Sequence, residues 1–512
     1  MQPVLGIDLG TSYSCVTTGV GDKVRILMDA AGRSTLPSIV NYKLGVPPMV
    51  GYPAQERLIT DPENTVYSFK RLLGRRFDSA EARLASASVP YRVLEGPNGE
   101  CLISVCGVSI PVHQVATDVL VHLKAVAEAE LQQRADEAVI CVPASFDEIQ
   151  RESTEVACRN AGIYVRRIIN EPTAAALAFG YGKHGSGRVA VYDFGGGTFD
   201  FTVLEIQQSF FRVLATAGDQ YLGGDDFDQA LAKAVANLFW HQTKVEISST
   251  QVAEWQRLVF ACERAKRELS EKESTQIQLP GVAYRASGRV DLDITVTRQI
   301  LEEAGAELLQ RSLDVCRDAL ASAGLQPKDL SSVVMVGGTT LMPIVRKRVA
   351  EFFGRTPDTR MNPMTAVAEG AAIQAMAADV SALTNPNMPL LVDVCPHTVG
   401  VEVAGFKFEP VITKNTPLPI EEVRTIHTHR DGQTEIRVRV YQGEAPDVRN
   451  NRFVGELRIK DLPLGPAGTV GVEVTFEVDV GGRLNVTARQ VGSGKMDAVR
   501  FRLASQLGVG GG

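Results

Sequence analysis

Two stretches of the sequence each place an aspartate, small residues and a hydroxyl side chain directly after an apolar strand. Residues 4–15 read VLGIDLGTSYSC, and residues 189–206 read VAVYDFGGGTFDFTVLEI. Glycines in a hairpin turn let the backbone approach a ligand closely, and successive backbone N–H groups can converge on an anion. An aspartate at a strand end, such as Asp193, can hold a hydrated Mg²⁺. A threonine hydroxyl, such as that of Thr198, can bond a phosphate oxygen.

One glycine hairpin is also an ordinary turn, but this sequence repeats the pattern. Asp8 and Asp193 lie 185 residues apart, and a third apolar strand, residues 333–336, runs into Gly337 and Gly338. Two such hairpins facing each other would clamp one nucleotide between the halves of a duplicated domain. The turn residues that we expect at the nucleotide are Gly10, Thr11, Ser12, Tyr13, Gly195, Gly196, Gly197, Thr198, Gly337, Gly338 and Thr339.

The composition is typical of a globular protein with more than one domain. A chain of 512 residues exceeds what one hydrophobic core normally serves, and 44% hydrophobic with 22% charged residues is ordinary. The net charge of −7 argues against a general nucleic-acid binder. The eight cysteines form no C-x-x-C pair, so we expect buried, reduced thiols. No leader-like or membrane-length apolar segment occurs, so we expect no membrane partner and a cytoplasmic location.

The character of the sequence changes near residue 380. Before it, helical spacing alternates with short apolar strands, whereas Ile436 and Val438 begin a period of two that recurs to the end of the chain. Turn signals at Gly443 and Gly481 separate these segments, which predicts an antiparallel β-sandwich. The expected divisions are an N-terminal domain 1–383, an apolar linker 384–393, a sandwich domain 394–505 and a glycine-rich tail 506–512.

The motifs resemble those of the 70-kDa heat-shock chaperones of the bacterial DnaK type, within the actin and sugar-kinase ATPase superfamily. They are GIDLGTSYSCV, KRLLGRRF, NEPTAAALAFG, YDFGGGTFD, LGGDDFD, ERAKRELS and VGGTTLMP, in that family's order and spacing. The resemblance implies a duplicated α/β actin-like ATPase domain followed by an all-β sandwich domain. It also implies ATP hydrolysis with ATP or ADP, Mg²⁺ and a further K⁺ ion, and binding of extended apolar segments of unfolded proteins.

The same resemblance assigns roles around the phosphates. Asp8, Glu171 and Asp193 would arrange Mg²⁺ mostly through water molecules. Lys70, together with Asp200 or Thr198, would position the water that attacks the γ-phosphate. The residues implied in catalysis are Lys70, Glu171, Asp193, Thr198 and Asp200.

Residues 250–270 are expected to form a helix over the adenosine. The resemblance implies that Glu263, Lys266 and Ser270 bond the ribose and base, and that Arg267 stacks on the adenine. Two nearby positions depart from the family. Leu341 stands where an arginine normally covers the other adenine face, and Met364 stands where family members usually carry an acid.

Further residues are implied in communication between the domains. Pro143 and Arg151 would relay the nucleotide state, and the apolar linker ending in Asp393 would dock on the ATPase domain when ATP is bound. Arg167 and Asn170 would serve a J-domain co-chaperone, and a nucleotide exchange factor is a further implied partner.

A peptide groove is implied in the sandwich. Ile436 would form its central apolar pocket, and Ala404 and His429 would stand at the two positions that arch over a bound peptide. The flanking positions are Val401, Ile426 and Val438. After Leu503 the sequence reads ASQLGVGGG, whereas the family continues with a helical lid, so we expect an uncovered groove with fast peptide exchange.

Two other functions fit part of the pattern. A sugar or small-metabolite kinase uses the same nucleotide clamp, but it would need a substrate pocket in place of the sandwich. A nucleotide-gated adaptor would hold one dedicated partner and hydrolyse ATP slowly, which the departures at Leu341 and Met364 would allow.

Overall fold

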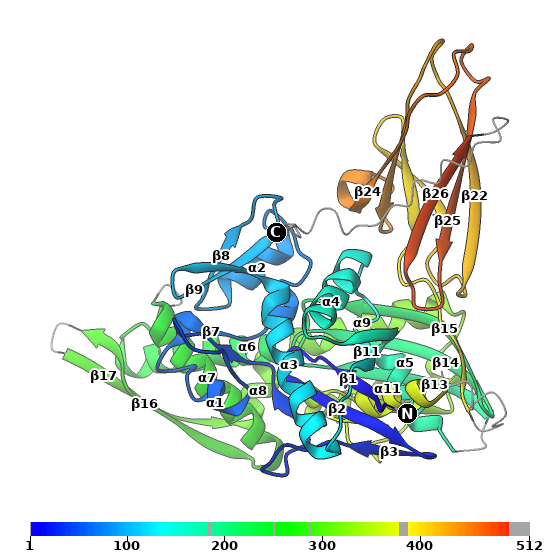
Figure 1. The fold of residues 1–512 in the computed structure, drawn as a ribbon. Helices are drawn as coiled ribbons and strands as arrows, with labels where there is room; N and C mark the ends of the chain where they lie inside the picture. The colour runs from blue at the N-terminus through cyan, green and yellow to red at the C-terminus, as the bar shows by residue number, and fades with distance from the viewer. Residues whose placement is uncertain (1, 183–185, 249–250, 286–287, 378–387, 491–512) are drawn as a thin grey trace.

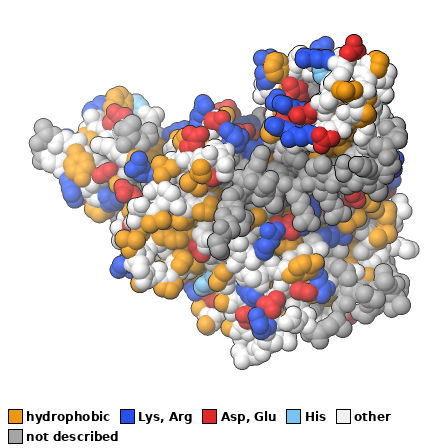
Figure 2. All heavy atoms as spheres, turned by 45° about the horizontal axis from the view of Figure 1, so that its top comes forward, with side chains coloured by type: hydrophobic (Ala, Val, Ile, Leu, Met, Phe, Trp, Pro, Cys, Tyr) orange, Lys and Arg blue, Asp and Glu red, His pale blue; other side chains and the backbone are white. Residues whose placement is uncertain are grey.

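The computed structural model describes residues 2–182, 186–248, 251–285, 288–377 and 388–490. We call residues 2–377 the N-terminal part and residues 394–490 the β-sandwich. In Figure 1 the β-sandwich stands to one side of the N-terminal part and contacts it at one end. No helix among the described residues is long and apolar enough to cross a membrane. Figure 2 shows basic and acidic side chains interspersed over the visible face.

The N-terminal part contains two sheets with the same connectivity. In the first, β1 (Val4–Asp8) runs parallel to β11 (Glu137–Val142) and antiparallel to β2 (Tyr13–Val20). In the second, β13 (Ser186–Phe194) runs parallel to β18 (Ser332–Val336) and antiparallel to β14 (Phe199–Gln207). The sheets are completed by β12 (Tyr164–Asn170), β3 (Lys23–Ile26) and β4 (Leu36–Pro37) in the first and by β15 (Phe210–Asp219) and β19 (Leu390–Val392) in the second. This correspondence confirms the predicted duplication.

Two apolar helices, α5 (Glu171–Gly180) and α11 (Ala366–Ala377), lie between the sheets. Both are rich in alanine and buried on nearly every side, so neither has the polar face of a surface helix. A Cβ at Gly370 would lie 1.8 Å from the Ala174 carbonyl oxygen, which explains the glycine. The close contact brings the two sheets near enough for their strand ends to share one site.

The outer faces of the sheets are covered by further helices. On the first sheet α3 (Val112–Leu131) packs against α4 (Glu148–Asn160), while α9 (Ala306–Ser322) and α10 (Pro343–Phe353) cover the second. Helix α3 ends at Leu131, because Gln132 takes a left-handed φ of 54°.

Two smaller units extend from these layers (Figure 1). One contains α6 (Gly224–Thr243), α7 (Val252–Glu271), α8 (Arg298–Ala304) and the hairpin of β16 (Ser274–Arg285) and β17 (Gly288–Thr297). The other contains β5 (Val40–Asn41), β6 (Met49–Val50), α1 (Tyr52–Gln55), β7 (Thr65–Val66), α2 (Ala80–Ala87), β8 (Arg92–Glu95), β9 (Cys101–Val105) and β10 (Val108–Pro111).

The β-sandwich consists of two antiparallel sheets around one apolar core. One sheet has the order β21-β20-β23-β24 and the other β22-β25-β26. Their bounds are β20 (Val399–Val403), β21 (Lys407–Ile412), β22 (Ile420–His427), β23 (Ile436–Gln442), β24 (Arg452–Ile459), β25 (Gly471–Val478) and β26 (Leu484–Gln490). The alternating apolar residues of both sheets meet in the core, as the period of two predicts.

The end of the predicted linker is an ordered strand. β19 pairs in parallel with β15, with Leu391 opposite Phe211, and so extends the second sheet of the N-terminal part. Leu391 is buried in the core between the sheets. The predicted boundary at residue 383 lies outside the described residues.

Candidate active site

The three glycine turns meet at the mouth of a cavity of about 760 Å³ between the two halves. A Cβ at Gly196 would lie 1.9 Å from the Ser12 Oγ, and one at Gly197 would lie 2.5 Å from a Thr11 side-chain atom. The Thr339 hydroxyl of the third turn donates to the Gly195 carbonyl at 2.8 Å. The glycines are therefore needed for the close approach of one hairpin to the other.

Four carboxylates gather below these turns. Asp8 ends β1, Asp193 lies near the end of β13, Glu171 begins α5, and Asp200 on β14 pairs across the strands with Asp193. The Lys70 ammonium donates to Glu171 Oε1 at 2.6 Å, and this pair is almost completely buried. One lysine among four acids leaves the cluster with an excess of negative charge.

The electrostatics of the cluster favour a bound cation. Burial and then Glu171 raise the pKa of Asp8, to about 7, whereas Lys70 lowers it. Burial and Glu171 also raise the pKa of Asp200 to about 7, and burial, Glu171 and Asp200 raise that of Asp193. Asp193 Oδ2 is buried and has no hydrogen-bond partner among the described residues. A positive ion nearby would favour the ionised carboxylates.

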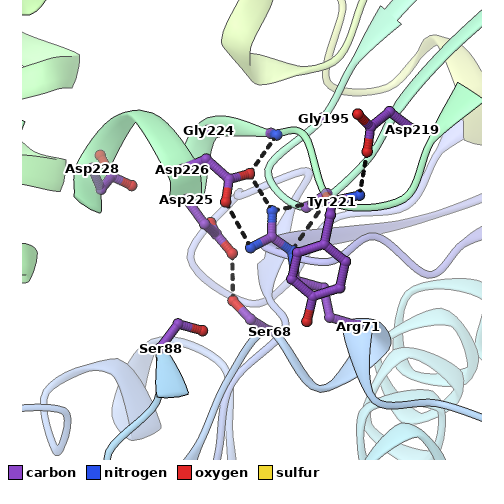
Figure 3. A network of polar contacts seen from close by, with 12 residues as sticks. Ser68, Arg71, Ser88, Gly195, Asp219, Tyr221, Gly224, Asp225, Asp226 and Asp228 are labelled. Atoms are coloured by element: carbon purple, nitrogen blue, oxygen red, sulfur yellow. Dashed lines mark hydrogen bonds and ion pairs between the residues drawn. The ribbon is translucent and has the colours of Figure 1, made fainter. Parts of the chain in front are cut away.

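A second polar network, which the sequence motifs did not predict, joins the two halves across the cleft (Figure 3). Arg71 donates to the Gly197 carbonyl from Nε at 3.1 Å and from a terminal nitrogen at 2.9 Å, and it pairs with Asp226. The Ser68 hydroxyl donates to Asp225 at 2.6 Å. The only sequence signal was a basic KRLLGRRF motif and an acidic LGGDDFD motif in one chain.

Arg71 follows Lys70 in the short helix Phe69–Arg71, and the two side chains serve different partners. Lys70 reaches the carboxylate cluster, whereas Arg71 holds the glycine turn and stacks over the Tyr221 ring, 4.9 Å from its centroid. This short helix therefore contacts both the carboxylate cluster and the glycine hairpin of the second half.

The α7 side of the cavity is lined by the predicted polar face. Arg267 bonds Tyr13 Oη at 2.5 Å and pairs with Glu263, while Lys266 bonds Asp228 at 2.8 Å. These side chains are thus held by protein partners at the cavity wall. Ser270 also lines the cavity and donates to the Lys266 carbonyl at 3.3 Å.

The opposite wall carries the two departures from the expected pattern. Leu341 is 42% exposed and lines the cavity, and Met364 also lines it, with its Sδ 3.1 Å from where a Gly338 Cβ would stand. Arg346 on α10, which was not predicted, also lines the cavity, and its Nε donates to the Thr340 carbonyl at 2.9 Å. An arginine five residues after Leu341 in the sequence therefore lines the same cavity.

Most predicted nucleotide and catalytic residues line this one cavity. They are Asp8, Gly10, Thr11, Ser12, Tyr13, Lys70, Glu171, Asp193, Gly195, Gly196, Thr198, Glu263, Lys266, Arg267, Ser270, Gly337, Gly338, Thr339 and Leu341. Gly197 is instead buried against Thr11, with its carbonyl turned to Arg71. Asp200 is 1% exposed and lies opposite Asp193, where its Oδ1 accepts from the Ser145 N–H at 3.0 Å.

Asp393 fixes the linker to the N-terminal part. Its Oδ2 accepts from Asn170 Nδ2 at 3.1 Å and Thr173 Oγ1 at 3.3 Å, and its Oδ1 accepts from the Val394 N–H at 2.8 Å. Arg151 donates to Asn170 Oδ1 at 2.6 Å. Asp393, Arg151 and Asn170 are therefore brought together in one buried cluster.

The loop between β11 and α4 contacts both the active site and the β-sandwich. Residues 143–147 are all buried, and the Phe146 ring lies 5.5 Å below the Lys70 ammonium. Asp147 pairs with Arg452 of the β-sandwich at 2.9 Å. Pro143 ends the strand before this loop, and its carbonyl accepts from the Phe146 N–H at 3.1 Å.

Arg167, one of the two predicted co-chaperone residues, contacts the β-sandwich. It donates to the Val480 carbonyl at 3.1 Å, and its Nε is buried without a partner among the described residues. Asn170 is only 5% exposed and is engaged by Arg151 and Asp393. In this arrangement neither side chain is fully open to another protein.

The predicted peptide-binding positions fall into two groups. Ile436 and Val438 are 3% and 2% exposed and belong to the sandwich core, against which Val401 and Ile426 are partly buried. Ala404 follows β20 and His429 follows β22, on the two facing sheets, and both are exposed. Ile436 is therefore enclosed by the sandwich core in this structure, and its role as a peptide pocket stays a prediction.

Comparison with known proteins agrees with this architecture. The family model described as Hsp70 protein matches residues 4–508. A relative described as chaperone protein DnaK, from Psychrobacter cryohalolentis, is 41% identical over 99% of this chain and 78% of its own length. The prediction of a missing lid concerns residues beyond 490, which lie outside the described part. The family match covers both sheets of the N-terminal part, the linker strand and the β-sandwich. The chain therefore belongs to the Hsp70 family and is an ATPase and an ATP-dependent chaperone of that type.

Proposed function

We propose that the 760 Å³ cavity binds ATP with its phosphates on the three glycine turns and its adenosine between α7 and Leu341. The observation that carries this proposal is the buried Lys70–Glu171 pair, which lies at the turns with Asp8 and Asp193. Backbone N–H groups of the turns and the hydroxyls of Thr11 and Thr198 would bond phosphate oxygens.

The carboxylate cluster fits a hydrated Mg²⁺ ion. Its donor atoms are all oxygens, which Mg²⁺ prefers, and the unpartnered Asp193 Oδ2 supplies a buried acceptor. No group of three acidic, histidine or cysteine side chains among the described residues is arranged to hold a metal directly. Asp8, Glu171 and Asp193 would therefore hold the ion through its waters, and the ion would neutralise phosphate charge. A K⁺ ion remains a prediction from the resemblance.

Lys70 is the residue that we propose to place the attacking water. Glu171 fixes its ammonium at 2.6 Å and Phe146 packs beneath it, so the cation is held at the phosphate end of the cavity. The water would attack the γ-phosphorus in line and the bond to the β-phosphate oxygen would break, giving ADP and inorganic phosphate. Asp200 and Thr198 would orient this water, and Lys70 would stabilise the charge that develops on the γ-phosphate.

Coupling to the β-sandwich is the second part of the proposal. The support is that the linker strand, Asp393 and the 143–147 loop all join the ATP site to the β-sandwich. The β-sandwich would bind extended apolar peptides along Val401, Ile426 and the core beneath them. Because Ile436 is enclosed here, peptide entry would require this region to open. A J-domain partner at Arg167 and a nucleotide exchange factor are further proposed partners, and a cytoplasmic location remains a prediction.

Replacing Asp193 tests the assigned active site. Asp193→Asn keeps the size of the side chain but removes the charge that would face Mg²⁺, so single-turnover ATP hydrolysis should fall by ~10²–10³-fold. Asp461→Asn, an exposed position in the β-sandwich, is the matched control and should leave the rate unchanged. Near-normal hydrolysis by Asp193→Asn would show that the reaction occurs elsewhere.

A further inference from the structure

The backbone of one residue, Ser145, lies between the β-sandwich and the active site. The Ser145 N–H donates to Asp200 Oδ1 at 3.0 Å, and the Ser145 carbonyl lies 2.9 Å from Nε2 of His397, which follows the linker strand. A carbonyl oxygen only accepts hydrogen bonds, so this contact requires a hydrogen on Nε2. His397 thus bonds the carbonyl and Asp200 the N–H of the same residue.

We propose that His397 is a positioning residue for ATP hydrolysis, through which the docked β-sandwich holds the Ser145 carbonyl, so that the Ser145 N–H is kept in place to orient Asp200. This inference rests on the proposed role of Asp200 in orienting the attacking water. His397 contacts neither ATP nor the water, and its effect must pass through Ser145.

Close packing around Ser145 restricts the movement of its backbone and of the Asp200 side chain. Ser145 and Asp200 are 8% and 1% exposed, and a Cβ on Gly218 of β15 would lie 2.4 Å from Asp200 Oδ1 and 2.9 Å from Ser145 Cβ. Gln220 donates to the same Ser145 carbonyl from the N-terminal part. A shift of the Ser145 backbone would therefore change its hydrogen bond to Asp200.

His397 is also open to protonation from solvent. Its half-buried ring lines a cleft of about 1310 Å³ between the N-terminal part and the β-sandwich. Burial lowers the pKa of His397 below its ordinary value, while the bond to Ser145 and nearby Asp147 oppose this shift. Lys414 and Arg151 lower it further. Charged His397 is therefore disfavoured in the docked arrangement.

The direction of the pH effect follows from linkage. A histidine released from the interface would take up a proton as the pH falls below about 6.5, and the docked arrangement opposes that proton. Docking of the β-sandwich through His397 should thus be strongest above about pH 6.5 and should weaken below it. Glutamine at this position can still donate one N–H but does not titrate.

The test is single-turnover ATP hydrolysis by the full chain at pH 7.5. His397→Leu removes the donor and should lower the rate about fivefold, the effect expected of one hydrogen bond. His397→Gln should restore it to within about twofold of the unaltered chain. His241→Leu, exposed on α6, is the matched control and should have no effect.

The same leucine change is then made in an Asp200→Asn chain. If His397 acts through Asp200, it should cause no further loss in that background, because the two changes affect one connection. Equal fold losses in both backgrounds would overturn the inference. If Asp200→Asn alone hydrolyses ATP normally, the proposed role of Asp200 fails instead.

The pH profile provides a readout that a purely structural role would not change. The rate of the unaltered chain relative to His397→Gln should be near one at pH 7.5 and should fall as the pH is lowered from 7 to 5.5. A ratio that stays constant over this range would contradict the assignment.

Discussion

Lys70 lies among more acidic side chains than it can neutralise. It bonds Glu171, and Asp8, Asp193 and Asp200 surround that pair in a buried site. Burial raises the pKa values of these aspartates, which favours the entry of further positive charge. The lysine that we propose to act on the γ-phosphate is therefore held in place by a buried partner.

Replacing this lysine should affect the chemical step more than binding. Lys70→Ala should lower the single-turnover rate of ATP hydrolysis by ~10²–10³-fold, as for the loss of one transition-state contact, and should change ATP affinity much less. Lys347→Ala, exposed on α10, is the control. Hydrolysis at a normal rate in Lys70→Ala would refute the role assigned to this side chain.

Arg346 lines the candidate nucleotide cavity, although the sequence did not predict it there. It lines the cavity next to Leu341, and its Nε is fixed by the Thr340 carbonyl. A guanidinium at this wall should interact with the base or ribose, so Arg346→Ala should weaken ATP binding about tenfold. Titration calorimetry measures this, with the exposed Arg348→Ala of the same helix as the control. Equal affinities for the two variants would exclude Arg346 from the site.

At the scale of elements, the 143–147 loop and the start of α4 lie between the candidate active site and the β-sandwich and contact both. Asp147 pairs with Arg452, and the Glu148 N–H donates to Gln442 Oε1 at 3.2 Å. Glu148 is buried and its Oε2 has no hydrogen-bond partner among the described residues. Burial raises the pKa of Glu148 to about 8, with Glu152 and Asp479 acting in the same direction and Arg151 in the opposite one.

This acid should make docking of the β-sandwich depend on pH. Glu148 is protonated in the docked arrangement below about pH 8, whereas an exposed glutamate ionises near its ordinary pKa of 4.5. Between these two pH values docking therefore takes up a proton. The equilibrium constant for docking should fall as the pH rises, by at most about tenfold per pH unit. Protease cleavage of the linker reports undocking. Glu148→Gln should remove this dependence, and an unchanged slope would count against it.

The repeated strand-and-glycine pattern was sufficient to predict the two facing hairpins, because Asp8 and Asp193 occupy the same place in duplicated sheets. The β-sandwich followed from its period of two. The contacts that join the elements were not predictable, since Arg71 and Gly197 are separated by 126 residues and His397 and Ser145 by 252. Local patterns determine elements, but such pairs depend on how complete sheets pack.

Helix ends and side-chain partners were likewise not predictable from local sequence patterns. Gln132 ends α3 in a left-handed conformation that its residue type does not signal. The polar face of α7 was predicted, but its pairing with Tyr13 and Asp228 depends on side chains from other elements. Ile436 has the alternation of a core strand, and that periodicity alone does not separate a core position from a peptide pocket.

On the scale of the whole molecule, the linker strand makes the β-sandwich an extension of the nucleotide-dependent part. β19 continues the second sheet, and Asp393 accepts hydrogen bonds from Asn170, Thr173 and the Val394 N–H. The Arg167 and Arg483 side chains add contacts from either side of this interface. Any change that nucleotide makes between the two sheets will therefore alter the fit of β19 and the β-sandwich, and the effect must be reciprocal.

Asp393→Asn tests this coupling most directly. The amide replaces one acceptor oxygen by a donor among groups that already donate, and it loses the charge that faces Arg151 and Arg167. Release of a fluorescent apolar heptapeptide is measured after ATP is added, beside basal hydrolysis, with Asp461→Asn as the control. We expect Asp393→Asn to keep basal hydrolysis and peptide binding but to lose the ATP-induced acceleration of release. Release as fast as in the unaltered chain would contradict the account that the linker carries the signal.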